Sequence, residues 1–283
     1  MRIKPFYFIV TLSLVFLLFL YGGGDFRRHT SKTIIFVITP TYYRLTQKPE
    51  LIRLCSTFSL IPDLHWIIVE DSVKKTDLVT QFSMECKVHI TQLFAASPKV
   101  SRPIKGSNQR NRGLQWILEN VKPGELKGVV YFADDDNTYH PKVFEEMRTT
   151  KRGSTWPVGL VGGRTWEGCV TDCNDKNKIT HFVTTFRPTR KFPIDMGAFA
   201  FNLDLLHAHP NASFDYVHTE EQEGLILSQL GFNSAFDLEP KASGCSEILV
   251  WHTKTQKPKV SKESLSDPVP RGCNATAFRG SSV

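Results

Sequence analysis

The chain has 283 residues, of which 41% are hydrophobic, and a formal net charge of +7 at pH 7. This length is sufficient to bury a substantial core, in one large domain or two small ones. The positive charge favours an acidic partner, such as anionic lipid, a nucleotide sugar or an acidic glycan. The basic residues are scattered and no combined aromatic and basic signature is present, which argues against nucleic-acid binding.

The N-terminus predicts a membrane anchor. Residues 6–21 carry no charge and follow Arg2 and Lys4. As a helix this stretch spans about 24 Å, close to the hydrocarbon thickness of a thin secretory membrane. We expect a cytosolic tail at 1–5, a signal anchor at 6–21 and a short stem at 22–32, which gives a single-pass type II protein. A cleaved signal peptide is the alternative.

Either alternative places the rest of the chain in the secretory lumen. Two acceptor sequons, at Asn211 and Asn274, agree with this location. The close spacing of Cys169 and Cys173 predicts a local disulfide in a loop, and no convincing zinc-ligand spacing is present. The remaining pairing is left open. The six cysteines are Cys55, Cys86, Cys169, Cys173, Cys245 and Cys273.

Buried strands alternate with helices up to about residue 150. Runs of apolar, largely β-branched or aromatic residues predict strands, and apolar residues at helical spacing predict helices. The predicted strands are 34–38, 66–69, 88–90 and 129–132, and the predicted helices are 48–60 and 108–120. We expect Pro40 to end the first strand. This alternation predicts a mostly parallel, Rossmann-like α/β sheet, whose ligands bind at the carboxyl ends of the strands.

The second half has a different texture. Short apolar runs at 158–161, 182–186 and 198–201 are separated by loop residues, and a helix is predicted at about 219–230. We therefore expect one catalytic domain with two halves. These are a nucleotide-binding half at 33–150 and an acceptor-binding half at 151–260, followed by a flexible tail at 261–283.

Three consecutive carboxylates, which we call the acidic triplet, follow the strand predicted at 129–132: Asp134, Asp135 and Asp136. In an extended chain the first and third side chains share one side and the second points away. Adjacent carboxylates repel each other, and hard oxygen ligands suit Mn²⁺ or Mg²⁺, which would also hold a diphosphate. The alternative is a solvated acidic turn before a helix, which Asn137 and Pro141 allow.

The triplet and several other motifs resemble the animal β-1,3-glucuronyltransferases, which build glycosaminoglycan linkers and related glycan caps. The resemblance is collinear and covers nearly everything from residue 33 to 260. The matching segments are 39–42, 64–71, 109–111, 128–139, 156–163, 192–196 and 250–253.

This resemblance implies a GT-A nucleotide-diphospho-sugar transferase fold in the Golgi membrane, with a luminal catalytic domain and a homodimeric assembly. It also implies UDP-glucuronate as the donor, Mn²⁺ as the cofactor, inversion at the anomeric carbon and a galactose-terminated acceptor glycan on protein or lipid. Asp136 would be the direct metal ligand, with Asp134 and Asp135 touching the sugar and ribose.

The same resemblance assigns the remaining donor contacts. The uracil and ribose would be held by Pro40, Tyr42 and Asp71. The charged groups of the donor would lie near Lys105 and Arg110, and the diphosphate near His252 and Lys254. The family usually has Arg where this chain has Lys105 and Lys254, and Lys lacks the bidentate geometry of Arg.

The resemblance also places the catalytic base, which takes the proton of the acceptor hydroxyl, at Glu223. The alternative is purely structural, because Thr219 and Gln222 have the spacing of a capping box and acids are favoured in a first helical turn. The family often has Arg just before the base, where this chain has Thr219 and Glu220.

On the acceptor side, Glu167, Arg190 and Asp195 match positions that hydrogen-bond sugar hydroxyls, and Phe186 matches a position that stacks on galactose. Without the resemblance, these residues would be interpreted as ordinary loop polarity and a core aromatic residue. The loop at 169–178 differs from the vertebrate pattern. Two alternative functions remain open: a transferase of the same fold with another UDP-sugar, and a catalytically silent luminal glycan-binding protein.

Overall fold

The computed structural model describes residues 33–98, 106–216 and 221–259. These residues belong to one compact unit, which begins at Thr33. The predicted anchor, stem and C-terminal tail lie outside the described residues. Among the helices that are described, none is long and apolar enough to cross a membrane.

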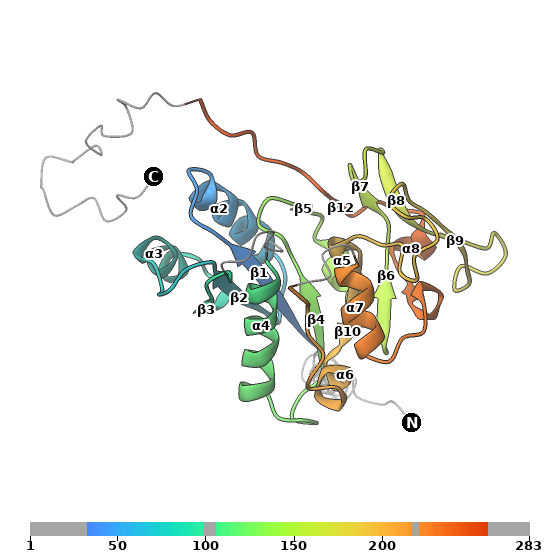
Figure 1. Cartoon of the computed structure of the whole chain (residues 1–283), viewed down its shortest axis with the longest axis horizontal. Helices are drawn as coiled ribbons and strands as arrows, with labels where there is room; N and C mark the ends of the chain where they lie inside the picture. The colour runs from blue at the N-terminus through green and yellow to red at the C-terminus, as the bar shows by residue number, and fades with distance from the viewer. Residues whose placement is uncertain (1–32, 99–105, 217–220, 260–283) are drawn as a thin grey trace, which may run out of the picture. The chain divides into compact units, whose positions relative to one another are not determined.

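The core is a mixed, mostly parallel sheet of seven strands in the order β11-β6-β10-β4-β1-β2-β3 (Figure 1). Strands β1, β2, β3 and β4 are parallel to one another, β10 is antiparallel to β4 and β6, and β11 is parallel to β6. Their bounds are β1 Ile34–Thr41, β2 Leu64–Glu70, β3 His89–Phe94, β4 Gly128–Phe132, β6 Gly153–Thr155, β10 Phe199–Asn202 and β11 Glu239–Pro240. The predicted α/β sheet is therefore confirmed.

A second sheet lies beside the first and has the order β5-β12-β7-β8-β9. Its strands are β5 Thr138–Tyr139, β7 Val158–Gly159, β8 Trp166–Thr171, β9 Ile179–Val183 and β12 Val250–Trp251. The helices are α2 Gln47–Phe58, α3 Asp77–Glu85, α4 Ser107–Asn120, α5 Lys142–Met147, α6 Leu203–Ala208, α7 Gln222–Gln229 and α8 Ala242–Cys245, with 3₁₀ turns η1 Met196–Ala198 and η2 Ala235–Asp237.

Helices cover the large sheet on both faces (Figure 1). The contacts of two adjacent residues of β2 show which helices lie on which face. Trp66 packs edge-on against Phe58 of α2 and Phe82 of α3. Its neighbour His65 packs edge-on against Trp116 of α4. Because successive side chains of a strand point to opposite faces, α2 and α3 lie on one face and α4 on the other. Burial on both faces explains why these strands are continuous apolar runs.

The first strand runs further than its sequence predicts. Pro40 was expected to end β1, but the strand continues to Thr41. Pairing with β4 stops at Ile38, opposite Phe132, whereas pairing with β2 continues to Thr41, opposite Glu70. Pro40 therefore occupies a position with a neighbour on one side only, where the missing backbone N–H costs no ladder hydrogen bond.

Two disulfides join segments that are distant in the sequence. Cys55 of α2 bonds to Cys86, the residue that ends α3, so the two helices on one face are tied together. Cys169 of β8 bonds to Cys245 of α8 and joins the second sheet to the segment before β12. Closing long loops in this way restricts the unfolded chain and thereby stabilises the fold.

The predicted local disulfide between Cys169 and Cys173 is wrong. Cys169 is fully buried in β8 and faces Cys245, whereas Cys173 is exposed in the turn after β8 and has no disulfide partner among the described residues. Cys273 lies outside them. The spacing was misleading because a strand fixes the direction of Cys169 before the turn begins.

The buried His65 predicts a specific loss of stability in acid. Burial, together with the adjacent His89 ring, lowers the pKa of His65 to about 4; the ring centroids are 4.0 Å apart. The unfolded chain binds this proton below pH 6.5 and the folded chain only near pH 4. The free energy of unfolding should therefore fall by up to about 3 kcal/mol between pH 6.5 and 4 through this group.

The measurement is urea unfolding of the wild type and of His65→Gln at several pH values from 7.5 to 4. We expect the difference in the free energy of unfolding between the two proteins to change as the pH falls, with the wild type losing stability relative to His65→Gln, because glutamine does not titrate. His181→Gln is the matched control, because that histidine is exposed in β9 of the second sheet and should not change the profile. Parallel profiles for the wild type and His65→Gln would contradict the assignment.

Candidate functional site

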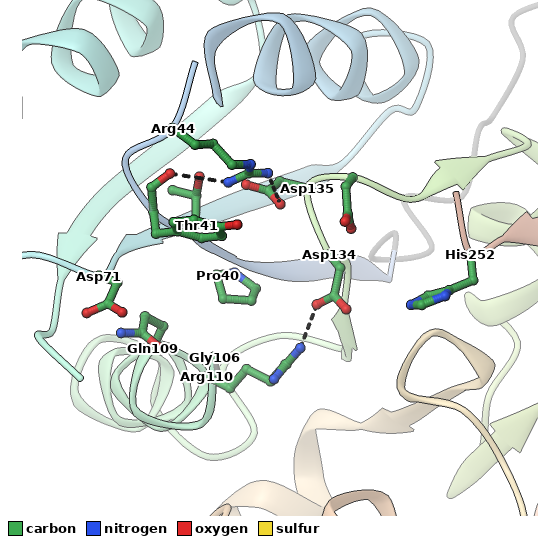
Figure 2. A pocket seen from close by; sticks show the side chains of 12 residues that line it. Pro40, Thr41, Arg44, Asp71, Gly106, Gln109, Arg110, Asp134, Asp135 and His252 are labelled. Carbon is green, nitrogen blue, oxygen red and sulfur yellow. Dashed lines mark hydrogen bonds and ion pairs between the residues drawn. The ribbon is translucent and has the colours of Figure 1, made fainter. Parts of the chain in front are cut away.

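A pocket of about 340 Å³ opens at the carboxyl ends of β1, β2 and β4 (Figure 2). This is the edge of the sheet where the sequence predicts ligand binding. Residues from both halves of the chain meet there. The lining residues are Pro40, Thr41, Tyr42, Arg44, Asp71, Gly106, Gln109, Arg110, Asp134, Asp135, Asp136 and His252.

The backbone of the acidic triplet is fixed by side chains from neighbouring elements. Arg53 of α2 donates to the carbonyl oxygens of Asp135 at 3.4 Å and Asp136 at 3.1 Å. The Tyr139 hydroxyl donates to the carbonyl oxygen of Asp134 at 2.9 Å. These contacts satisfy backbone acceptors just beyond β4, so the three carboxylates project from a held segment.

The first two side chains of the triplet form ion pairs with different arginines. Asp134 lies 2.5 Å from Arg110 of α4, and Asp135 lies 2.7 Å from Arg44, which precedes α2. Figure 2 shows these arginines on opposite sides of the triplet. The triplet is nevertheless not an extended segment, because residues 135 and 136 lie in a turn in which the backbone N–H of Asn137 donates to the carbonyl oxygen of Asp134 at 3.3 Å.

Among the described residues Asp136 forms no ion pair with an arginine, so its carboxylate is the best placed of the three to hold a cation. Burial raises the pKa of Asp136, and the neighbouring charges of Asp134 and Glu50 raise it further. A divalent cation would offset this repulsion, and an oxygen donor suits Mn²⁺ or Mg²⁺.

Across the described ranges, no three His, Cys, Asp or Glu side chains form a ready-made cage for a metal ion. Metals of this type are commonly held by one or two carboxylates together with substrate phosphates. A single carboxylate ligand, Asp136, facing a pocket that could hold a diphosphate, fits that pattern.

Another part of the pocket wall is formed by Tyr42, Asp71 and Gly106. The Tyr42 side chain is 48% exposed. The Asp71 carboxylate accepts hydrogen bonds from the backbone N–H of Ser97 at 2.7 Å and from its hydroxyl at 2.6 Å. Gly106 has a φ of +84°, in the left-handed region that favours glycine.

The structure thus places the predicted Pro40, Tyr42 and Asp71 in one pocket with Arg110. Lys105, the remaining predicted cation near the donor, lies outside the described residues.

His252 reaches the pocket because β12 pairs with β5, which directly follows the triplet. The Thr253 hydroxyl donates to the carbonyl oxygen of Asp136 at 2.5 Å, which fixes the chain after β12. Lys254 lies further along and lines an adjoining cavity of about 400 Å³, which also contains Tyr42 and Asp136. The predicted diphosphate contacts, His252 and Lys254, therefore lie on the Asp136 side of the pocket.

Glu223 occupies the first turn of α7 and is half-buried. Burial, followed by the charge of Asp195, raises the pKa of Glu223 to about 7, although Arg190 and Arg110 act in the opposite direction. A carboxylate with a pKa near neutrality is suited to accept a proton at physiological pH. Glu223 therefore has the pKa that a general base would need.

The predicted capping box is wrong, because α7 begins at Gln222 with Glu221 as its N-cap. Gln222 is then the first helical residue and not the third, and its side-chain oxygen accepts from the backbone N–H of Asp215. Thr219 lies outside the described residues. The structural explanation of Glu223 is weaker as a result.

The predicted acceptor residues do not line the donor pocket, and two of them hold loops. The buried Glu167 accepts from the Thr184 hydroxyl at 2.9 Å and from the Thr185 backbone N–H at 2.7 Å. Arg190 donates to the carbonyl oxygens of Phe186 at 2.5 Å and Ile194 at 2.8 Å. These contacts alone would explain Glu167 and Arg190.

Asp195 and Phe186, unlike Glu167 and Arg190, have features beyond loop contacts. Asp195 caps η1 by accepting from the backbone N–H of Gly197 at 2.9 Å, and it lies close enough to Glu223 to raise the pKa of that carboxyl. Phe186 is 46% exposed, with the Arg190 guanidinium 5.2 Å from its ring centre. The side chain of Phe186 is therefore available for stacking and is not a core residue. The sequon residue Asn211 is exposed in a turn, and Asn274 lies outside the described residues.

The sequence interpretation missed Arg44 and gave no individual role to Gln109. Arg44 contacts Asp135, Glu50 and the Tyr42 ring, and Gln109 donates to the carbonyl oxygen of Ala95 at 2.6 Å. A search for cations within a few residues of Tyr42, which was predicted to contact the nucleoside, would have found Arg44.

Comparison with known proteins identifies relatives of the whole catalytic region. Residues 54–256 match the model of glycosyltransferase family 43. The chain is 42% identical to galactosylgalactosylxylosylprotein 3-beta-glucuronosyltransferase sqv-8 of Caenorhabditis elegans, over 84% of this chain and 69% of that protein. It is 42% identical to galactosylgalactosylxylosylprotein 3-beta-glucuronosyltransferase 3 of Homo sapiens, over 84% of this chain and 75% of that protein.

Among solved structures, S. aureus TarS matches with a TM-score of 0.50 at 14% identity, covering 78% of this chain and 37% of that chain. This likeness supports the GT-A-like α/β fold and nothing finer. The match to the family model extends over most of the chain and includes the acidic triplet, His252 and Glu223. The chain therefore belongs to glycosyltransferase family 43.

Proposed function

We propose that this protein is a β-1,3-glucuronosyltransferase. It transfers glucuronate from UDP-glucuronate to the 3-hydroxyl of a terminal galactose, with inversion at the anomeric carbon. The relatives at 42% identity are named for this reaction on a galactosylgalactosylxylosyl protein, which favours the proteoglycan linkage region as the acceptor. The observation that carries the proposal is the acidic triplet at the end of β4, facing a pocket whose other walls include Tyr42, Arg110 and His252.

In this proposal the donor lies along the pocket. Tyr42, Pro40 and Asp71 bind the uracil and ribose. Asp136 would hold Mn²⁺, which when bound supplies positive charge to the leaving diphosphate. His252 and Lys254 add donors on the same side, while Asp134 and Arg110 orient the sugar; such groups stabilise charge where it develops.

Glu223 is the proposed base. Its carboxylate removes the proton of the acceptor hydroxyl as that oxygen bonds to the anomeric carbon. The bond between this carbon and the diphosphate oxygen breaks, and UDP leaves with the bonding electrons. Attack from the face opposite to UDP inverts the anomeric configuration. Asp195 acts indirectly, because its negative charge makes Glu223 more basic.

The acceptor is proposed to lie over the loop that follows β9. The exposed ring of Phe186 offers a surface on which galactose can stack. Arg190 and Glu167 hold this loop through backbone contacts, and any hydrogen bonds to sugar hydroxyls would add to that role. We also propose a homodimer in the Golgi membrane, anchored through residues 6–21 with the catalytic domain in the lumen.

The test is a transfer assay with purified full-length protein, Mn²⁺, a panel of labelled UDP-sugars and two acceptors, one ending in Gal-Gal-Xyl and one in N-acetyllactosamine. We expect UDP-glucuronate to be used at least about a hundredfold better than the other donors, because a site that pairs with a sugar carboxylate discriminates strongly against its absence. Transfer from a different UDP-sugar would support the same-fold alternative. Acceptor binding without transfer from any donor would indicate a silent glycan-binding protein.

A further inference from the structure

Arg44 lines the pocket and makes several contacts there, although none of the roles assigned above includes it. Its guanidinium forms ion pairs with Glu50 and with Asp135, and it donates to the carbonyl oxygen of Tyr42 at 3.2 Å. The guanidinium carbon also lies 4.4 Å from the centre of the Tyr42 ring. The side chain is only 17% exposed, so these contacts hold it in one position.

The two carboxylates that share Arg44 are themselves buried. The side chain of Glu50 is 2% exposed and that of Asp135 is 8% exposed. Without a cation between them, two buried negative charges would repel each other and push Asp135 out of its present position. Arg44 therefore determines where the middle carboxylate of the triplet stands.

The contact with Tyr42 has a different consequence. An arginine over one face of a ring holds that ring by a cation–π interaction. The Tyr42 side chain nevertheless remains 48% exposed and lines the pocket. The ring is thus supported by Arg44 while much of its surface stays available to a planar ligand.

From these contacts we propose that Arg44 is a positioning residue for the nucleoside part of the donor. It acts through the Tyr42 ring and the Asp135 carboxylate, and not by attracting the diphosphate. This inference rests on the proposed function, which supplies a uridine nucleotide as the ligand. A guanidinium that only neutralised phosphate would not need two buried carboxylates and a stacked ring as partners.

The experiment compares uridine with UDP, so that base recognition is separated from charge attraction. Binding of each ligand to the full-length protein is measured by ligand-observed NMR, with Mn²⁺ present throughout. Arg44→Lys keeps the charge and loses the flat, forked geometry. We expect it to weaken uridine and UDP by a similar factor, roughly tenfold, as for a lost stacking and ion-pair contact. In the transfer assay the donor KM should rise with kcat nearly unchanged.

A double-mutant cycle tests the route of action. Tyr42→Leu alone should also weaken uridine, and adding Arg44→Lys in that background should have a clearly smaller effect than in the wild type. The matched control is Arg112→Met, which removes a half-buried arginine of α4 paired with Glu119 and should leave both affinities unchanged. If Arg44→Lys proves too unstable, Arg44→Met with Glu50→Gln removes one buried charge of each sign.

The outcomes separate this inference from the proposed function. A variant that loses UDP affinity but keeps uridine affinity would show direct attraction of the diphosphate and overturn the inference. Fully additive effects of the Tyr42 and Arg44 substitutions would overturn it as well. Wild-type protein that binds neither ligand would instead defeat the proposed function, and the inference with it.

Discussion

Replacing Glu223 by glutamine is expected to lower kcat for glucuronate transfer by about a thousandfold, within the range typical of a lost general base. Glutamine keeps the size of the side chain but cannot accept the acceptor proton. UDP affinity should remain within about twofold of the wild type, because Glu223 does not line the donor pocket.

The pH profile gives a second readout of the same residue. Burial and the charge of Asp195 raise the pKa of Glu223 to about 7. Below that pH the carboxyl is protonated and cannot act as a base. The wild-type kcat/KM, which reports ionisations of the free enzyme, should therefore fall about tenfold for each pH unit below 7. The residual activity of Glu223→Gln should lack this acidic limb.

Protein stability gives a third readout, which is independent of the substrate. A carboxyl whose pKa is raised on folding destabilises the folded state above that pKa, and the cost disappears below the pKa of the unfolded chain, near 4.5. Glu223→Gln should therefore raise the free energy of unfolding by about 1–3 kcal/mol at pH 8 and hardly change it at pH 4.5.

Glu221→Gln is the matched control, because Glu221 is exposed at the N-cap of the same helix. It should leave kcat, the acidic limb and stability nearly unchanged. If Glu223→Gln kept the wild-type kcat, or if Glu221→Gln lost as much activity as Glu223→Gln, the assignment of Glu223 as the base would be wrong.

The sequence could predict the donor side because the relevant signals there are local. Continuous apolar runs marked the strands, and the residues that follow each run, such as Asp71 and Asp136, lie at the carboxyl edge of the sheet by geometry alone. His252 is different. It reaches Asp136 only because β12 pairs with β5, and no periodicity in the sequence specifies that pairing. Its position near the triplet was predicted from the resemblance and not from the residues.

The acceptor side could not be predicted in the same way. Its strands are short and its loops long, so the contacts that define it are distant in sequence. Cys169 pairs with Cys245 across that distance, although the nearer Cys173 was the local expectation. Glu167 was predicted as a sugar ligand from the resemblance, and its carboxylate also accepts hydrogen bonds from the loop at Thr184 and Thr185. Spacing alone does not show which polar side chains are already satisfied within the protein.

Asp136 provides the second prediction with a large effect. Its carboxylate is half-buried and lies close to the charge of Asp134, and burial, together with the charges of Asp134 and Glu50, raises the pKa of Asp136. Holding this group ionised without a counter-charge is unfavourable, and a bound divalent cation supplies that charge. Because protons compete with metal for the carboxylate, metal affinity should weaken towards acid pH sooner than at an ordinary aspartate.

Asp136→Asn should therefore abolish the coupling between metal and nucleotide. In the wild type, Mn²⁺ should tighten UDP binding by at least about a hundredfold, and Mn²⁺ with UDP should raise the melting temperature by several degrees. The variant should show neither effect, and its transfer rate should fall by about a thousandfold or more.

The control is Asp204→Asn, which changes an exposed acid at the start of α6 and should behave as the wild type. Because UDP binding is measured without an acceptor, this result does not depend on turnover. Metal-dependent UDP binding that survives in Asp136→Asn would mean that Asp134 or the nucleotide alone holds the ion, and the assignment of Asp136 as the metal ligand would be wrong.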